Sequence, residues 1–206
     1  MVEVTALDRR PPAGLATLDR QPPAGLAPLP QSPGVTITLA PPMQRWIFRG
    51  SADAARACGS TFGVDLPERA CHAVAAGGKA ALWLGPDEWL LLSPPGTEFD
   101  PRGLPAPHSV VNVSHRQLGI EISGAGAGAL LNAHVNLDFD TNVDANVDTK
   151  AGTPTFTAGM SSRTLLGKAE IVLWRRSDEV YHMEVWRSFA VYIMGMLAEA
   201  CRDGAE

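Results

Sequence analysis

From residue 35 onward the sequence consists mainly of short runs of strand-forming residues, with few segments of helical pattern between them. Alternating apolar and polar side chains are typical of strands that bury one face. The expected strands cover 35–40, 45–50, 79–85, 88–93, 109–115, 117–123, 156–167, 168–176 and 179–187. Because these strands follow one another in meanders, we expect an α+β fold with antiparallel sheets rather than a doubly wound parallel sheet.

Turn and helix signals divide these strands. Gly85-Pro86-Asp87-Glu88 predicts a tight turn that joins two strands into a hairpin, with Trp83 and Trp89 near its closed end. Ser51 predicts the N-cap of a short helix that runs to residue 63. A final helix is expected from Ser188 to about Cys201. Its sequence is apolar nearly all round, which predicts burial on more than one side.

Proline-rich segments indicate the domain organisation. The segment 94–108 reads as a connector, so we expect an N-terminal α+β subdomain over 35–107 and a C-terminal α+β subdomain over 108–206. Residues 1–34 contain an eleven-residue repeat, LDRRPPAGLA followed by LDRQPPAGLA, and proline pairs that prevent helix formation. Two interpretations of this arm remain open. It is a disordered leader, or it lies along a larger partner subunit with its leucines in shallow pockets, namely Leu15, Leu18, Leu26 and Leu29.

Charge and cysteine content exclude several classes of protein. Charged residues make up 19% of the chain, below the roughly 25% of typical domains, which suggests a surface covered by a partner. A net charge of −5 without a basic stripe argues against nucleic acid and anionic membranes as partners. The sequence has no secretory signal and no apolar run long enough to span a membrane, so we expect a cytoplasmic protein. Three cysteines without a CxxC pair predict neither a disulfide framework nor a zinc knuckle.

A glycine cluster, Gly124-x-Gly126-x-x-Ala129, fits the looser form of the dinucleotide-binding fingerprint. That fingerprint also needs a βαβ unit and an acidic residue about twenty positions later. The helix that follows can hold only about eight residues, and the nearest candidate acids are Asp138 and Asp140. We therefore expect a tight strand-to-helix turn here and no nucleotide.

The remaining site motifs are also incomplete. Asp144-x-Asn146-x-Asp148 begins like a calcium loop, but Thr149 and Thr155 stand where such a loop needs Gly and Glu. The histidines show no zinc-binding spacing, and Cys71-His72 are sequence neighbours whose side chains diverge. Ser114-His115-Arg116 follows a strand and reads either as a polar group in a cleft or as a structural turn.

Two further sets of side chains have structural expectations. Asp87 and Glu88 lie in a turn, where exposure is the default. Core packing accounts for most of the five tryptophans, and one or two of them are expected at an interface. These residues are Trp46, Trp83, Trp89, Trp174 and Trp186.

Four longer strings resemble the gamma subunit of heterotetrameric sarcosine oxidase. They are WLGPDEWLLL at 83–92, VNVSHRQLGIEISG at 111–124, RTLLGKAEIVLWR at 163–175 and MEVWRSFAVYIMGMLAEA at 183–200. The resemblance covers most of residues 80–200 and none of residues 1–34.

The resemblance implies a fold like the folate-binding domain of aminomethyltransferases and a complex with alpha, beta and delta subunits. Such complexes oxidatively demethylate sarcosine to glycine, forming hydrogen peroxide and, with tetrahydrofolate, 5,10-methylenetetrahydrofolate. FAD, FMN, NAD, zinc and tetrahydrofolate are then expected in the other subunits. In this chain the resemblance implies no catalytic residue and no bound cofactor or metal.

Two alternatives remain at this stage. One is a stand-alone folate-binding protein of the same fold, in which Arg116 or Arg163 would pair with the ligand's carboxylates. The other is a scaffold without a small-molecule site.

Overall fold

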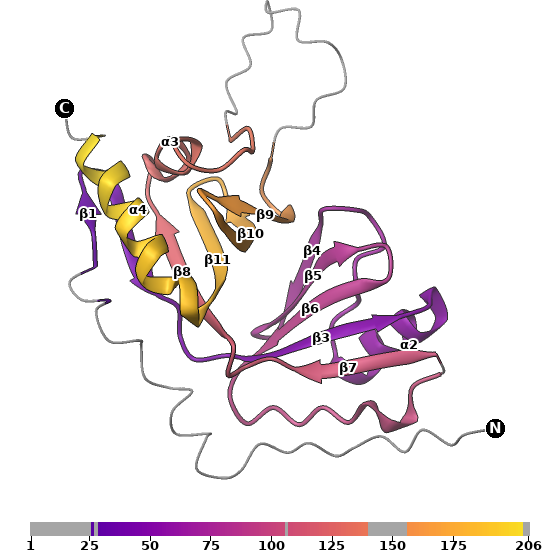
Figure 1. Cartoon of the computed structure of the whole chain (residues 1–206). Coiled ribbons are helices and arrows are strands. Elements are labelled where there is room, and N and C mark those ends of the chain that lie inside the picture. Colours follow the sequence, from indigo (N-terminus) through magenta and orange to yellow (C-terminus); the bar gives the residue numbers. More distant parts are fainter. Residues whose placement is uncertain (1–25, 27–28, 106, 140–155, 204–206) are drawn as a thin grey trace, which may run out of the picture.

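The computed structural model describes residues 26, 29–105, 107–139 and 156–203. These residues form two antiparallel sheets that pack face to face, with helices on the outer face of each (Figure 1). The predicted α+β class with antiparallel sheets is confirmed. None of the helices formed by the described residues is long and apolar enough to cross a membrane.

The first sheet has six strands in the order β1-β2-β8-β11-β10-β9. Their bounds are Gln31–Ser32 for β1, Val35–Leu39 for β2, Gln117–Ser123 for β8, Val180–Trp186 for β11, Ala169–Ser177 for β10 and Ser161–Leu166 for β9. Helices α3 (Ala127–Asn132) and α4 (Ala190–Asp203) lie on its outer face, and a 3-10 turn, η2 (Arg187–Phe189), leads into α4. The main hydrophobic core lies between this sheet and its two helices.

The second sheet has five strands in the order β4-β5-β6-β3-β7. Their bounds are Ala73–Ala76 for β4, Lys79–Gly85 for β5, Glu88–Ser93 for β6, Gln44–Gly50 for β3 and His108–Asn112 for β7. Helix α2 (Ala52–Phe62) covers the outer face, and a short 3-10 turn, η1, spans Pro101–Gly103. The Ser51 side chain accepts a hydrogen bond from the amide of Ala54, which confirms the predicted N-cap.

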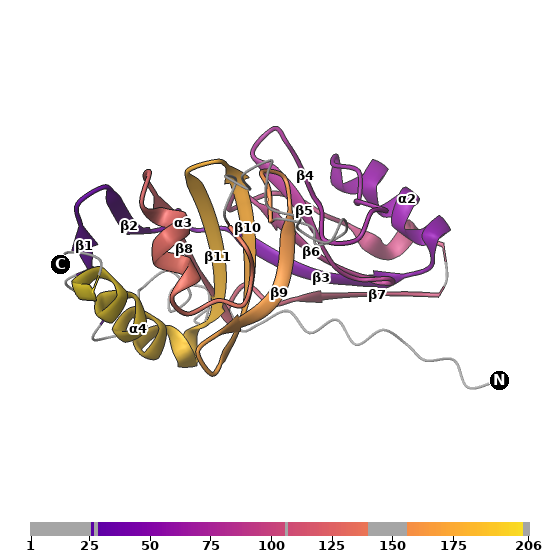
Figure 2. The ribbon, with the colours of Figure 1, turned by 90° about the horizontal axis from the view of Figure 1, so that it is seen from above.

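Alternation along the strands assigns each apolar side chain to one of three layers of core. On β5 and β6, Ala81 and Leu91 face α2, whereas Leu82 and Leu92 face the other sheet. Val172 of β10 belongs to the same central layer, while its neighbours on β10 face α3 and α4. The molecule is therefore a four-layer stack of helices, sheet, sheet and helix, as the view from above shows (Figure 2).

The predicted hairpin is confirmed, with β5 and β6 paired in antiparallel register and Trp83 opposite Trp89 near the turn. Trp89 and Trp46 are buried in the core beneath α2, and the indole Nε1 of Trp89 donates to the carbonyl of Pro67 at 2.9 Å. These tryptophans have the core role that the sequence predicts for most of the set. Trp186 differs, because 37% of its surface is exposed.

The two sheets do not coincide with the predicted subdomains 35–107 and 108–206. The division into domains at these boundaries stays a prediction. Strands β1 and β2 join the six-stranded sheet, where β2 pairs with β8 of the C-terminal half. In exchange, β7 from the C-terminal half pairs with β3 in the five-stranded sheet. Each half of the chain thus supplies strands to the other half's sheet.

The end of the N-terminal arm packs on the chain's own core. Leu26 is only 4% exposed within the cluster under α3 and α4, and Leu29 packs against the same cluster. The hypothesis that Leu26 and Leu29 fill pockets on a larger subunit is therefore wrong, because their partners are within this chain. Leu15 and Leu18 lie outside the described residues.

The final helix buries one side only. Ile193, Met194, Leu197 and Cys201 of α4 are buried against the sheet, but Val191 and Tyr192 are exposed by 51% and 39%. Burial of α4 on more than one side is thus wrong for the chain by itself. An apolar face of the helix remains open.

Candidate functional site

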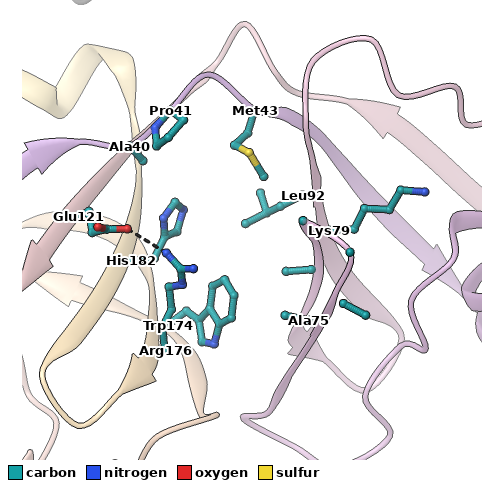
Figure 3. A pocket seen from close by; sticks show the side chains of 14 residues that line it. Ala40, Pro41, Met43, Ala75, Lys79, Leu92, Glu121, Trp174, Arg176 and His182 are labelled. Carbon is teal, nitrogen blue, oxygen red and sulfur yellow. Dashed lines mark hydrogen bonds and ion pairs between the residues drawn. The ribbon is translucent and has the colours of Figure 1, made fainter.

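The main candidate site is a pocket of about 410 Å³ between the two sheets. One wall comes from the six-stranded sheet, with Trp174 and Arg176 on β10 and His182 on β11. The opposite wall consists of Leu92 on β6 and of the β4–β5 turn, and the link from β2 to β3 closes the top (Figure 3). On this side the lining residues are small, with Ala75 and Ala76 at the end of β4 and Gly77 and Gly78 in the turn that follows.

The charged residues that line the pocket are paired with other protein groups. Arg176 donates to Glu121 at 2.9 Å and stacks over the ring of Trp174. Lys79 donates to the carbonyl of Phe62 at 2.6 Å, and its side chain points away from the pocket (Figure 3). His182 contacts the carboxylate of Glu184 at 2.7 Å. The pocket therefore presents apolar surface and an indole ring, rather than an unpaired cation that would hold an anionic ligand.

Behind His182 lies a buried ionic network that joins the two sheets. Arg45 of β3 donates from Nε and Nη2 to the two carboxylate oxygens of Glu184 on β11, at 2.5 and 2.9 Å. The network consists of Arg45, His182 and Glu184. These side chains are buried, with exposed fractions of 5%, 5% and 1%. Burial alone would raise the pKa of Glu184, but the charge of Arg45 and the hydrogen bond from His182 hold that pKa below its ordinary value.

Gly119 of β8 makes room for this network. A Cβ at this position would lie 3.0 Å from both the Arg45 guanidinium and the His182 ring, and 2.8 Å from the Cβ of Ala40. We call this network the inter-sheet clamp, because Arg45 comes from one sheet and Glu184 from the other. Both carboxylate oxygens of Glu184 are engaged by protein partners within it. Sequence reasoning did not find it, since Arg45 and Glu184 are 139 positions apart.

The glycine cluster forms the predicted tight turn between β8 and α3. Gly124 has a φ of +116°, and a Cβ there would lie 2.1 Å from the carbonyl oxygen of Gly34. The same oxygen accepts a hydrogen bond from the Gly126 amide at 3.1 Å. A pyrophosphate would need that amide, so the turn does not fit a dinucleotide and instead anchors the β1–β2 connection.

Ser114, His115 and Arg116 form the turn between β7 and β8, away from the pocket. The Ser114 hydroxyl accepts from the Arg45 amide at 2.9 Å, His115 is exposed, and Arg116 stacks over Trp186 with 4.7 Å to the ring centroid. Arg163 of β9 pairs with Glu88 of β6 at 2.6 Å and so links the two sheets. Arg163 is thus engaged within the chain, and neither Arg116 nor Arg163 lines the pocket between the sheets, so the geometry does not favour the folate-binder alternative.

The other motifs lie apart from the pocket. Cys71 and His72 precede β4, and the His72 ring contacts the carbonyl of Ala70 at 2.9 Å. Burial raises the pKa of the Cys58 thiol to about 12, so this thiol is not a nucleophile near neutral pH. Asp87 is paired with Arg49 in the hairpin turn. The calcium-like segment 144–155 lies outside the described residues, and among those described no three His, Cys, Asp or Glu side chains gather as a metal site would require.

Known proteins resemble this chain in sequence. A model of the sarcosine oxidase, gamma subunit family matches residues 49–203. A sarcosine oxidase subunit gamma of Corynebacterium sp. (strain P-1) is 26% identical over 156 residues, covering 72% of this chain and 70% of the relative. The subunit gamma of an Arthrobacter species is 28% identical over 161 residues, covering 76% of this chain and 73% of the relative.

Solved structures share the fold. A chain of the heterotetrameric sarcosine oxidase from Corynebacterium sp. U-96, in complex with pyrrole 2-carboxylate, superposes with a TM-score of 0.69 at 21% identity, covering 94% of both chains. The glycine cleavage system aminomethyltransferase T from Bartonella henselae gives a TM-score of 0.56 at 12% identity, covering 91% of this chain and 51% of the other. The predicted aminomethyltransferase-like architecture is confirmed by these likenesses. Because the family model spans well over half of the sequence, from the end of β3 to the end of α4, this chain belongs to the sarcosine oxidase gamma subunit family.

Proposed function

We propose that this chain is the gamma subunit of a heterotetrameric sarcosine oxidase and that its role there is structural. The observation that carries the proposal is the family match over residues 49–203, which takes in every described helix and all strands except β1, β2 and most of β3. The relatives of matching length, each a sarcosine oxidase subunit gamma, support it. The complex would oxidatively demethylate sarcosine to glycine, with formation of hydrogen peroxide and 5,10-methylenetetrahydrofolate.

The chemistry of the described side chains supports a non-catalytic role. The polar groups around the pocket are engaged with one another, and the Gly126 amide is bound to Gly34. In the described residues, the cations of the pocket are thus already bound to protein groups, and the glycine turn has its amide engaged, which disfavours a flavin phosphate, a dinucleotide or a folate carboxylate at either place. FAD, FMN, NAD, zinc and tetrahydrofolate would accordingly be held by the alpha, beta and delta subunits.

Co-expression tests the proposal directly. The chain should co-purify with alpha, beta and delta subunits, and native mass spectrometry should give one copy of each. The same preparation should oxidise sarcosine and release hydrogen peroxide. A chain that remained alone in the presence of all three subunits would contradict the proposed function.

The absence of a cofactor role is tested on the purified chain. Its absorption spectrum should show no flavin, and calorimetric titration with NAD or tetrahydrofolate should give no heat of binding. A tight one-to-one complex with any of these ligands would contradict the proposal that this subunit is purely structural.

A further inference from the structure

An apolar and aromatic surface lies at the start of α4, and nothing in the described part of the chain covers it. We define the α4 patch as Arg116, Trp186, Phe189, Val191 and Tyr192. Trp186, Phe189, Val191 and Tyr192 are exposed by 37%, 41%, 51% and 39%. Exposed large apolar side chains that cluster in this way mark interaction surfaces.

Contacts within the patch hold it in one arrangement. Trp186, at the end of β11, pairs with Gln117 of β8, which places the preceding Arg116 over the indole ring at 4.7 Å. The Trp186 and Phe189 rings lie 6.4 Å apart, and the Tyr192 hydroxyl accepts from the Lys168 amide at 3.2 Å. The Arg187 amide also donates to the carbonyl of Arg116 at 2.8 Å, which fixes the β7–β8 turn to the start of η2. A surface ordered before binding loses less conformational entropy when a partner docks.

The charge of Arg116 indicates the chemistry of the partner. Its Nε is buried, and no described residue accepts a hydrogen bond from it. Several other arginines at the surface are paired with carboxylates within the chain, as Arg49 is with Asp87, Arg163 with Glu88 and Arg176 with Glu121. A guanidinium that stacks on an exposed tryptophan, and that has no carboxylate partner among the described residues, can donate hydrogen bonds to a carboxylate of another protein.

We infer that the α4 patch is the surface by which this chain docks onto another subunit of the oxidase, through an apolar segment that brings a carboxylate to Arg116. The inference rests on the proposed function. Trp, Tyr, Phe and Arg are the residues enriched at the centres of protein interfaces, and the last turns of α4, with Glu199 and Arg202 exposed, form a charged edge to the patch. Docking here covers the face of α4 that the chain leaves open.

The test measures binding of the purified chain to the co-expressed alpha, beta and delta subunits by interferometry. Val191→Asp and Arg116→Glu change the patch at side chains that are exposed or half-buried, and Val74→Asp changes an exposed valine (37%) on β4, at the far edge of the other sheet. Each patch variant should raise the Kd by about tenfold or more, as truncation of a hot-spot residue does, while Val74→Asp changes it by less than about twofold. Thermal unfolding of each isolated variant verifies that it folds like the unaltered chain.

Salt dependence tests the carboxylate separately. Raising the salt concentration should weaken binding of the unaltered chain, and Arg116→Gln should weaken binding at low salt and flatten this dependence. Unchanged affinity of Val191→Asp, or an Arg116→Gln variant that binds like the unaltered chain at every salt concentration, overturns the inference while the proposed function stands. If the unaltered chain binds none of the three subunits, the proposed function fails and the inference fails with it.

Discussion

At the scale of single residues, one buried ion pair connects the two sheets of this protein. Arg45 and Glu184 come from opposite sheets, and the ion pair between them is shielded from solvent together with His182. A buried pair of this kind is strongly destabilised when one partner is removed, since the other charge then remains without compensation. This ion pair should therefore affect two measurable quantities, the free energy of unfolding and its dependence on pH.

The first signature is the effect of neutralising Glu184. Glu184→Gln should lower the free energy of unfolding by about 3–5 kcal/mol at pH 7, because Arg45 stays buried without its carboxylate. The matched control is Glu121→Gln, which removes the more exposed ion pair with Arg176 and should cost no more than about 1 kcal/mol. Urea unfolding followed by circular dichroism gives both values. Equal losses for the two variants would show that the buried pair has no special weight.

The second signature is the pH dependence of stability. The pKa of Glu184 is below its ordinary value of 4.5 in the folded chain, so the unfolded chain takes up this proton first as the pH falls. Its contribution to stability is thus fully present above about pH 4.5 and declines as the pH drops from there toward the folded pKa. The free energy of unfolding of the unaltered chain should fall over this range more steeply than that of Glu184→Gln. Parallel pH profiles for the two proteins would contradict the assignment.

Gly124 is a residue whose backbone angle permits no side chain. Gly124→Ala should destabilise the chain by at least about 1–3 kcal/mol, because its φ of +116° and the carbonyl of Gly34 both exclude a Cβ. Gly195 in α4 is the control, since a Cβ there would meet no atom within 4 Å. Gly195→Ala should stabilise the helix by about 0.5–1 kcal/mol. Thermal unfolding separates the two, and a stable Gly124→Ala variant would mean that the β1–β2 connection can move away.

At the scale of the element, helix α4 has two faces that its sequence does not distinguish. Met194 is 6% exposed and packs in the main core, whereas Val191 is 51% exposed on the open face. Both are apolar residues in the same helix. Only their position relative to the sheet separates the buried face from the face that we propose for docking.

A pair of charge substitutions tests this division. Met194→Asp should lower the free energy of unfolding by about 3–5 kcal/mol, because a carboxylate would enter the core without a partner. Val191→Asp should change it by no more than about 0.5 kcal/mol in the isolated chain, since its side chain meets solvent. Chemical unfolding of the two variants measures the difference. Similar losses for both would mean that α4 is covered on both sides within the chain.

At the scale of the whole molecule, residues far apart in the sequence share one hydrophobic core. Leu26 near the start of the described residues and Cys201 near their end belong to the same core cluster, beneath α3 and α4. Because β2 and β7 are also exchanged between the halves of the sequence, we expect the two sheets to unfold as one cooperative unit. Folding of either half alone would leave strands without partners.

The N-terminal anchor is tested by shortening one side chain. Leu26→Ala should destabilise the chain by about 2–5 kcal/mol, because it leaves a cavity in the core. Leu165→Ala is the control, since Leu165 is 49% exposed and should contribute no more than about 0.5 kcal/mol. A single unfolding transition is expected for both variants, recorded by fluorescence and by circular dichroism. A negligible loss for Leu26→Ala would show that the arm does not hold the core.

Local patterns in the sequence determined the elements. Alternation predicted β2, β3, β5, β6, β8, β10 and β11, Ser51 predicted the start of α2, and the turn at 85–88 predicted the hairpin, since all of these depend on neighbouring residues. The glycine cluster predicted a tight turn for the same reason. The longer strings were sufficient to identify the family.

The tertiary structure alone decided how these elements combine. No local rule places β2 beside β8, brings Arg45 to Glu184 across 139 positions, or directs Leu26 into the core rather than onto a partner. Nor does the sequence of α4 reveal which apolar side remains open, because a helix that is apolar all round carries no signal of orientation. Long-range pairing and burial depend on which surfaces meet when the whole chain packs, and that is why the pocket, the clamp and the α4 patch emerge only at this level.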